Sequence, residues 1–392
     1  MSLRFSASQW LSVLALAFCY CAAIASVTVM PIAAGALVAG LRIPTGDVGY
    51  VFALELTASA AGSIAISPWV ARIDAGRALP VALVGLILVT LASYLSTHAG
   101  AYIGWRCLVG VIEGGIQGLV LALAARTRAP QRAFGAIFTL APLVESLLFV
   151  LLPHLEARWG IKTILLVPAA VAAVALGMTP FIVARGVGLT AVRPLSSRAT
   201  PVARNGQFIL VLVSWFLFIV AQAGVWVYLA QIAAALHIAF AAINLILAGG
   251  SFCGIFAGMV AGWCDRRFAF AGPLALIVLA NAAALGYYGV ASDTFDFGVS
   301  TLLGFVALYF AFPFFSSLAS EVDPTGRIPA LLPAAQASGL AIGPAVASLV
   351  LGGGENYPRV CAVGFALALL GLLVVIPALK AGQQMKRAPA AV

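Results

Sequence analysis

The amino-acid sequence predicts an all-α membrane protein in which twelve transmembrane helices form two pseudo-symmetric six-helix bundles. Composition is the first observation, because 63% of the 392 residues are hydrophobic, only 8% are charged, and the mean hydropathy is +1.12. A soluble domain of this size could not bury so much apolar surface, so most of the chain must have lipid as its solvent. The apolar runs are also uninterrupted, which indicates helices, since strands of a membrane barrel alternate polar and apolar residues.

A helix needs roughly 20 mostly apolar residues to cross a bilayer. Segments of about that length follow one another along the whole chain with short connections. In chain order, we expect helices at residues 10–34, 48–70, 79–97, 101–125, 133–153, 161–183, 207–232, 241–262, 269–290, 298–318, 328–350 and 359–379. The first segment has no small-residue cleavage site and more spans follow it, so we expect a retained helix and not a signal peptide.

The distribution of basic residues predicts the orientation of the helices. Of the 21 Arg and Lys residues, sixteen fall on the side of the N-terminus, four on the other side, and Arg106 lies within a span. The sixteen are Arg4, Arg72, Arg77, Arg126, Arg128, Arg132, Arg185, Arg193, Arg198, Arg204, Arg266, Arg267, Arg327, Lys380, Lys386 and Arg387, and the four are Arg42, Arg158, Lys162 and Arg359. Basic residues are in excess on the cytoplasmic side, so we expect both termini in the cytoplasm.

The abundance of Ala and the choice of Arg over Lys are typical of a GC-rich bacterial genome, which favours a bacterial inner membrane as the location. With this topology, the basic residues that give the chain its net charge of +9 orient it in the membrane and contact anionic lipid headgroups. We therefore expect the lipid bilayer, and no nucleic acid, as the partner of the basic residues.

The longest polar connection predicts the domain boundaries. It is basic, contains no acidic residue, and divides the chain into an N-terminal bundle (1–184), a cytoplasmic linker (185–206) and a C-terminal bundle (207–392). The halves echo each other, because Asp74 and Asp265 follow corresponding helices and a proline follows a small residue at both Pro142 and Pro344. A weak repeat of about half the chain is typical of transporters built from two bundles, with the site near the membrane midplane.

These features resemble the major facilitator superfamily over essentially the whole chain. The loop signature of that family, a Gly followed by Asp-Arg and Gly-Arg, is kept in part at Asp74, Gly76 and Arg77, and more closely between Gly258 and Arg267. The resemblance implies that Asp74, Arg77, Asp265 and Arg266 gate the cytoplasmic side. The alternative is that they are ordinary exposed charges, and each aspartate could also cap a neighbouring helix.

The segment 101–125 is similar to the Arg-x-x-x-Gly pattern of the family through Arg106 and Gly110, and Glu113 is similar to a Glu in its organic-anion branch. The segment 133–153 departs from the drug/proton antiporter signature at Ala141-Pro142, whereas the segment 328–350 keeps a better version that ends at Gly343-Pro344. The resemblance implies a secondary transporter that works by alternating access.

The ionisable residues well inside the apolar segments are Glu55, Arg106, Glu113 and Glu145. At 1.5 Å per residue, Arg106 lies roughly 8 Å and Glu113 roughly 18 Å below the outer face, while Glu145 lies roughly 18 Å above the cytoplasmic face. Both carboxylates are therefore close to the middle of a core about 30 Å thick. Two carboxylates in low dielectric cannot both ionise cheaply, so Glu113 and Glu145 are the predicted proton sites. Arg106 can neutralise Glu55 or Glu113, or attract an anionic substrate, and a purely structural Arg–Glu pair is the alternative.

The predicted C-terminal helices contain no ionisable residue well inside them, but they offer amides and aromatic rings that suit a solute with a ring or a carbonyl. With Arg106 and Glu55, the predicted substrate-binding residues are Gln222, Trp226, Asn244, Tyr309 and Gln336. Taken singly, each of these is often a packing or interfacial residue. The six cysteines form no CxxC motif or Cys/His cluster, so no metal or cofactor is expected.

The sequence therefore predicts proton-coupled import of a small organic solute, such as an organic anion, by a monomer. The alternative is proton-antiport efflux of lipophilic compounds, which Gly343-Pro344 and the neutral aromatic C-terminal half favour. A membrane enzyme would need a motif such as HExxH or a Ser/His pair, which the sequence lacks. A channel is disfavoured because no ring of like charges is visible.

Overall fold

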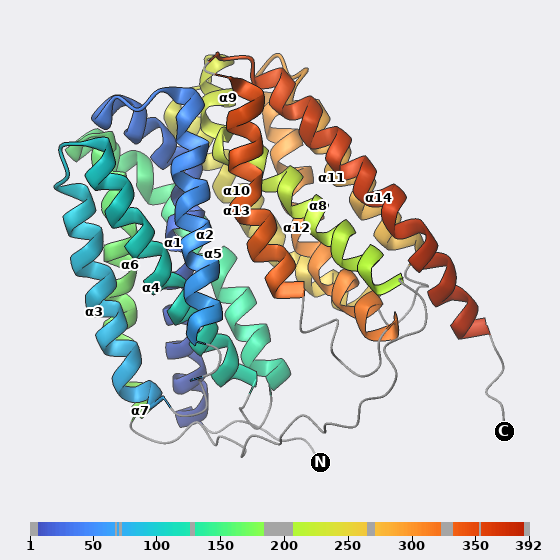
Figure 1. Ribbon diagram of the computed structural model, residues 1–392, viewed down its shortest axis with the longest axis horizontal. Coiled ribbons are helices and arrows are strands. Elements are labelled where there is room, and N and C mark those ends of the chain that lie inside the picture. The colour runs from blue at the N-terminus through green and yellow to red at the C-terminus, as the bar shows by residue number, and fades with distance from the viewer. Residues whose placement is uncertain are drawn as a thin grey trace. The chain divides into compact units, whose positions relative to one another are not determined.

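The computed structural model describes residues 7–66, 69, 73–125, 130–183, 207–264, 271–322, 332–352 and 354–387. Within this part of the chain, the regular elements are helices (Figure 1). Ten helical stretches are long and apolar enough to cross a membrane, and helices α10 and α11 have shorter apolar stretches. The prediction of an all-α, multi-pass membrane protein is thus confirmed.

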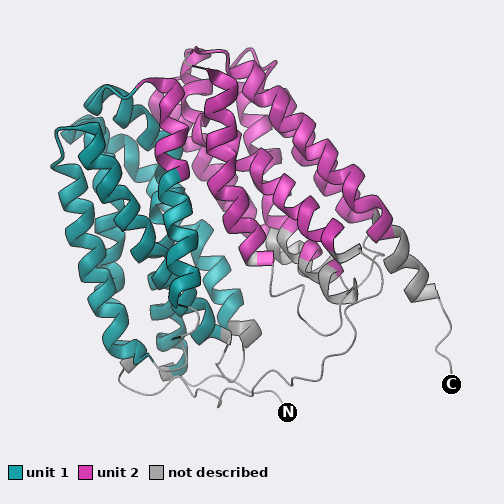
Figure 2. Cartoon of the chain, in the orientation of Figure 1, with its two compact units in different colours: residues 1–43, 54–197 teal, residues 44–53, 198–392 magenta. Residues whose placement is uncertain are grey.

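The chain divides into two compact units (Figure 2). Unit 1 comprises residues 1–43 and 54–197, and unit 2 comprises residues 44–53 and 198–392. The segment 44–53, which the sequence placed in the N-terminal bundle, groups with unit 2. The predicted linker at 185–206 lies outside the described residues.

Unit 1 is built around α1, which packs against α4, α5 and α6, while α3 packs against α4 and α6. Its elements are α1 (Ala7–Leu41), α2 (Val48–Ile66, from Leu54 on), α3 (Ala75–Tyr94), α4 (Ala99–Ala125), α5 (Pro130–Trp159), the 3-10 helix η3 (Ile161–Leu166), α6 (Val167–Met178) and α7 (Pro180–Val183).

Unit 2 is built around α8, which packs against α13 and α14, while α12 packs against α10 and α11. Its elements are the 3-10 helix η1 (Thr45–Asp47), the start of α2, α8 (Gln207–Val227), α9 (Leu229–Ala235), α10 (Phe240–Cys264), α11 (Ala271–Tyr288), α12 (Thr294–Val322), α13 (Leu332–Leu351) and α14 (Tyr357–Arg387).

Local sequence explains where several helices begin and end. Helix α3 begins at Ala75, four residues before the predicted start, because the Asp74 carboxylate accepts the Gly76 N–H at 3.0 Å and caps the helix. The capping role considered for Asp74 is therefore confirmed. Helix α5 ends at Trp159 because Gly160 adopts a φ of +82°, which glycine tolerates best.

Two predicted helices are interrupted. The sixth segment contains η3, α6 and α7, and prolines stand where α6 and α7 begin, as expected for a residue that fits the first turn of a helix. The seventh segment breaks at Tyr228, whose backbone leaves helical geometry with φ −105° and ψ 8°.

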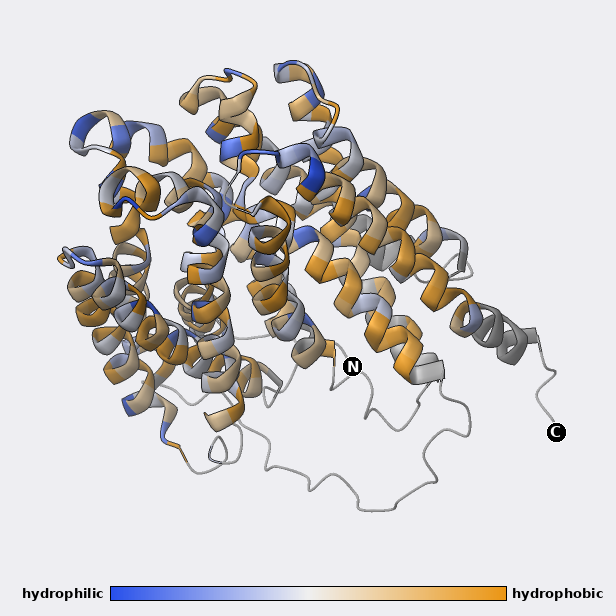
Figure 3. Cartoon of the chain, turned by 45° about the horizontal axis from the view of Figure 1, so that its top comes forward, coloured by the Kyte–Doolittle hydropathy of each residue, from blue (hydrophilic) through white to orange (hydrophobic). Residues whose placement is uncertain are grey.

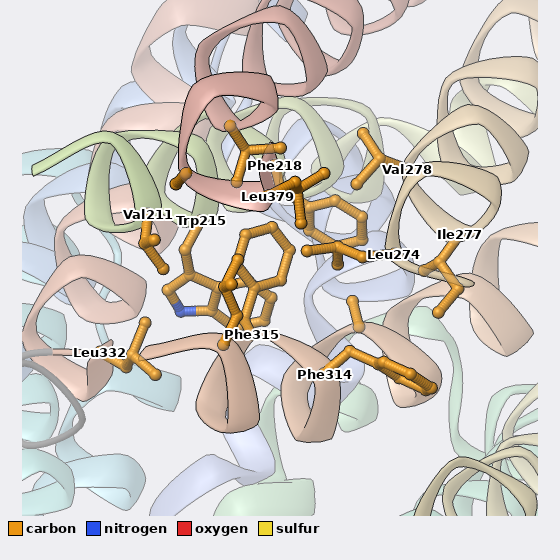
Figure 4. Close-up of a cluster of buried hydrophobic side chains, with 14 of the residues drawn as sticks. Val211, Trp215, Phe218, Leu274, Ile277, Val278, Phe314, Phe315, Leu332 and Leu379 are labelled. Atoms are coloured by element: carbon orange, nitrogen blue, oxygen red, sulfur yellow. The ribbon is translucent and has the colours of Figure 1, made fainter. Parts of the chain in front are cut away.

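The core of unit 2 is aromatic (Figure 4). The rings of Trp215 and Phe218 stack at 5.6 Å, and Phe315 lies 4.9 Å from Trp215. Leucines and valines from α11, α13 and α14 surround these rings, so the cluster joins five helices of the unit. Such a core holds α8 and α12 in a fixed register.

The surface of each unit is apolar as well. Large side chains such as Val81 on α3, Leu276 on α11 and Leu349 on α13 are 68–72% exposed. Figure 3 shows hydrophobic residues along most of the length of the helices. A soluble protein rarely exposes so many large apolar side chains, so these faces fit a lipid environment.

Candidate functional site

A buried cluster of charged residues lies in unit 1, where α1, α2 and α4 meet. Helix α4 supplies Arg106 and Glu113, which are seven residues apart and therefore lie two turns apart on one face. Helix α2 supplies Glu55, and α1 supplies Ser26. Each of the four residues is at most 4% exposed. We call these four residues the charge network.

The network is continuous from one carboxylate to the other. Arg106 donates two hydrogen bonds to Glu55, from Nε to Oε2 at 2.8 Å and from Nη2 to Oε1. The same Nη2 donates to Ser26 Oγ at 2.8 Å, and the Ser26 hydroxyl donates to Glu113 Oε1 at 2.6 Å. Glu55 and Arg106, which the sequence predicted to lie at equal depth, thus form an ion pair.

Glycines allow α2 and α4 to approach closely enough for this pairing. A Cβ added at Gly110 would lie 2.2 Å from the backbone oxygen of Glu55, and one at Gly114 only 1.8 Å from that of Ser59. On the opposing helix, a Cβ at Gly62 would lie 2.1 Å from the Val111 oxygen. Small residues spaced four apart are a common way to bring membrane helices into contact. Here they set the distance at which Arg106 meets Glu55.

The charges of the network do not balance if both carboxylates are ionised. Arg106 provides one positive charge and its bidentate hydrogen bonds go to Glu55, whereas Glu113 accepts a hydrogen bond from Ser26 and forms no ion pair within the described part of the chain. An unpaired carboxylate in a low-dielectric interior is costly, and taking up a proton removes that cost. Among the described residues, no group of three or more His, Cys, Asp or Glu side chains could hold a metal ion. The arrangement is suited to binding a proton at Glu113.

Glu145, the second predicted proton site, lies on α5 and is only partly buried. Glu145 is not without a partner, but it takes no part in the hydrogen bonds that join Ser26, Arg106 and the other two residues of the charge network. Conversely, sequence reasoning missed Ser26. A serine inside the first apolar segment was the available signal, but nothing local indicates that it bridges Arg106 and Glu113.

Two of the residues predicted to bind substrate line a small cavity inside unit 2, which has room for about one water molecule. Gln222 and Trp226 lie one turn apart on α8, and the other lining residues come mainly from α11 and α12. They are Val225, Leu229, Leu285, Tyr288, Thr301, Gly304 and Phe305. The ring of Trp226 meets Phe305 edge-on at 5.6 Å, and Tyr288 donates to Thr301 at 3.0 Å. The Gln222 Oε1 atom is buried without a hydrogen-bond partner in the described chain.

The other predicted substrate residues do not line this cavity. Asn244 is fully buried on α10 and donates to the Phe240 carbonyl at 2.9 Å. Tyr309 stacks on Phe305 and packs on Gly254, where an added Cβ would lie 2.1 Å from its ring. Gln336 is partly buried on α13. For Tyr309, these contacts fit the packing alternative.

The predicted gating residues are described only in part. Asp74 and Arg77 form an exposed ion pair at 3.5 Å at the start of α3. Asp265 and Arg266 lie outside the described residues. A surface pair of this kind contributes little stability, so its geometry alone assigns no role beyond capping α3.

The helices and the buried charge network define a multi-pass membrane protein built from two helical units. No known family model and no curated protein matches the sequence. Solved structures do match it. A bacterial homologue of the human lysosomal transporter Spinster, in an inward-facing and unoccupied conformation, is similar at a TM-score of 0.69 and 14% identity, covering 97% of this chain and 98% of that one.

Two further neighbours are transporters as well. The human organic anion transporter MFSD10 (TETRAN) is similar at a TM-score of 0.63 and 15% identity, over 95% of this chain and 100% of that one. A mutant of the nucleoside transporter NupG is similar at a TM-score of 0.70 and 11% identity, over 94% and 99% of the two chains. The chain has the fold of the major facilitator superfamily.

Proposed function

We propose that this protein is a secondary active transporter that moves a small organic solute across a bacterial inner membrane by alternating access, and that a proton on Glu113 couples the movement to the proton gradient. The fold supports the transporter class, since its neighbours are transporters. The observation that carries the coupling is the buried network of two carboxylates and one guanidinium. A buried ionisable group in a membrane protein is retained for a function more often than for stability.

In this proposal Glu113 is the group that gains and loses the proton. Arg106 and Glu55 neutralise each other, so binding or release of a proton at Glu113 changes the net charge of the network between zero and minus one. Ser26 transmits that change, because its hydroxyl contacts both Glu113 and Arg106. A change in buried charge alters the free energy of the site differently in each conformation. A proton can therefore favour one conformation over another.

The proposed substrate is a small organic solute that moves into the cell in the same direction as the proton. The neighbours transport different classes of solute, an organic anion and a nucleoside in the two cases named, so the fold does not select among classes. If the solute is an anion, it must compete with Glu55 for Arg106, since the guanidinium already holds that carboxylate. Amide and aromatic side chains such as Gln222 and Trp226 are the proposed contacts for its uncharged part.

Infrared spectroscopy of the purified protein in lipid nanodiscs tests the proton site without any knowledge of the substrate. A protonated buried carboxyl absorbs apart from an ionised one, and we expect a pH-dependent carboxyl band that disappears in Glu113→Gln and persists in Glu145→Gln. Absence of any band assignable to Glu113 between mildly acidic and mildly alkaline pH would refute the coupling role.

A ligand-stabilisation screen with small carboxylates, aromatic solutes and lipophilic cations then tests the substrate class and direction. Stabilisation by small carboxylates alone supports the import of an organic anion. Broad stabilisation by lipophilic cations would instead support efflux. Gly343 of the signature on α13 does not by itself favour efflux, because a Cβ there would lie 2.7 Å from the Val220 oxygen on α8, so helix packing already accounts for this glycine.

A further inference from the structure

The start of helix α2 is held by residues of unit 2 far away in the sequence. The first N–H groups of any helix have no acceptor within the helix and need one from elsewhere. In α2, the Gly49 N–H donates to the phenol oxygen of Tyr228 at 3.3 Å. Tyr228 thus caps a helix that begins 180 residues before it, and the cap lies entirely within unit 2.

The hydroxyl of Tyr228 is saturated with partners. It donates to the Thr45 carbonyl at 3.1 Å and lies 2.8 Å from the Ser348 hydroxyl on α13. A phenol has one hydrogen to donate and two lone pairs, so Thr45 takes the donor while Gly49 and Ser348 fill the acceptor sites. Tyr228 is fully buried, which makes each of these hydrogen bonds costly to leave unmade.

Gly49 brings α2 into backbone contact with α13. A Cβ at this position would lie 2.2 Å from Ser348 Oγ and 2.3 Å from the carbonyl oxygen of Pro344. A helix backbone cannot move aside as a side chain can, so only glycine fits. We call Thr45, Gly49, Tyr228 and Ser348 the α2 seat.

The same helix carries Glu55. Glu55 lies six residues after Gly49, roughly 9 Å along the helix axis, and the span Val48–Ile66 contains no proline. One end of this short, unbroken stretch is fixed at the α2 seat and the other at Arg106. A displacement of one anchor must reach the other through the helix, because a helix of this length bends little without a proline or a bulge.

We propose that Tyr228 is a positioning residue: the α2 seat and the Glu55–Arg106 pair are coupled anchors of one helix, so that releasing the seat weakens the pair and weakening the pair releases the seat. The role in transport rests on the proposed function, since an alternating-access cycle would use this coupling to link movement of α2 to the charge network. The coupling itself does not require transport. By thermodynamic reciprocity its size is the same in both directions.

Site-resolved hydrogen exchange on the full chain in lipid nanodiscs measures the seat. Tyr228→Phe keeps the ring but removes the acceptor of the Gly49 N–H, so exchange of that amide should rise by about three- to tenfold, the range expected for one or two net hydrogen bonds. Tyr357→Phe is the matched control, because its ring lies 6.2 Å from that of Tyr228 in the same cluster. Gly49→Ala should also raise exchange across residues 45–53, whereas Gly298→Ala, where an added Cβ would meet only Ile246 at 4.0 Å, should not.

The coupling is measured from the opposite end of the helix. Glu55→Gln breaks the pair with Arg106, and we expect it to raise exchange at Gly49 although it touches no residue of the seat. Combining it with Tyr228→Phe should give less than the product of the two separate fold-changes, as coupled sites do. If Glu55→Gln leaves Gly49 unchanged, or if the two effects multiply, the anchors are independent and the inference is wrong. None of these measurements involves a proton on Glu113, so failure here and failure of the proposed function are distinguishable.

Discussion

Arg106→Gln is expected to destabilise the protein by about 3–5 kcal/mol, because it removes one partner of a buried ion pair and leaves the other charge uncompensated. The structure sets this magnitude. Arg106 makes two hydrogen bonds to Glu55 and one to Ser26, and Glu55 is 2% exposed, so water cannot replace the lost contacts. Such a change lowers the folding equilibrium constant roughly a hundred- to several-thousand-fold, given that 1.4 kcal/mol is a factor of ten. Protonation of Glu55 would reduce the cost at low pH.

Equilibrium unfolding in mixed micelles of increasing SDS content measures this loss. Arg77→Gln is the matched control, since Arg77 is 91% exposed and its ion pair with Asp74 should matter little. The double variant Glu55→Gln with Arg106→Gln should recover most of the stability, because two neutral amides replace the charged pair and can hydrogen-bond each other. A single variant as stable as the control would refute the argument from burial. If the double variant is stable but no longer binds an anionic substrate, Arg106 contacts the substrate as well as Glu55; restored transport excludes that role.

Three further predictions concern coupling, topology and packing. Glu113→Gln should abolish accumulation driven by a proton gradient but leave solute exchange at equal gradients largely intact; unchanged accumulation would mean that the network is structural. A cysteine at Thr97, in a cysteine-free background, should react with an impermeant maleimide added outside cells, since the basic loops are predicted to be cytoplasmic, and labelling only from inside would reverse the topology. Gly114→Ala should cost about 1–3 kcal/mol in the same unfolding assay, because the added Cβ would lie 1.8 Å from a backbone oxygen of α2, whereas Gly115→Ala, with open space at its Cβ, should be nearly neutral. Equal effects at the two glycines would argue against tight packing of α2 on α4.

The sequence by itself determined the class of protein and the position of its helices. Hydropathy is a property of local composition, and a span must be apolar whatever it packs against, so the helical segments could be recognised without knowing their neighbours. Rare charges in those segments were equally visible. Their spacing placed Arg106 and Glu113 on one face of α4 and put Glu55 at the depth of Arg106, which left pairing as one of the open alternatives.

Tertiary structure alone decided which of these residues meet. A helical repeat shows which residues share a face, but it does not show which face of another helix that face will contact. For this reason Ser26 could not be recognised as the link between Arg106 and Glu113, and Glu145 could not be separated from the charge network. The same reason hid the α2 seat, where Tyr228 and Gly49 come together across 179 residues of sequence. Contact between helices depends on their register and on where glycines allow close approach, and both are settled only when the chain is packed.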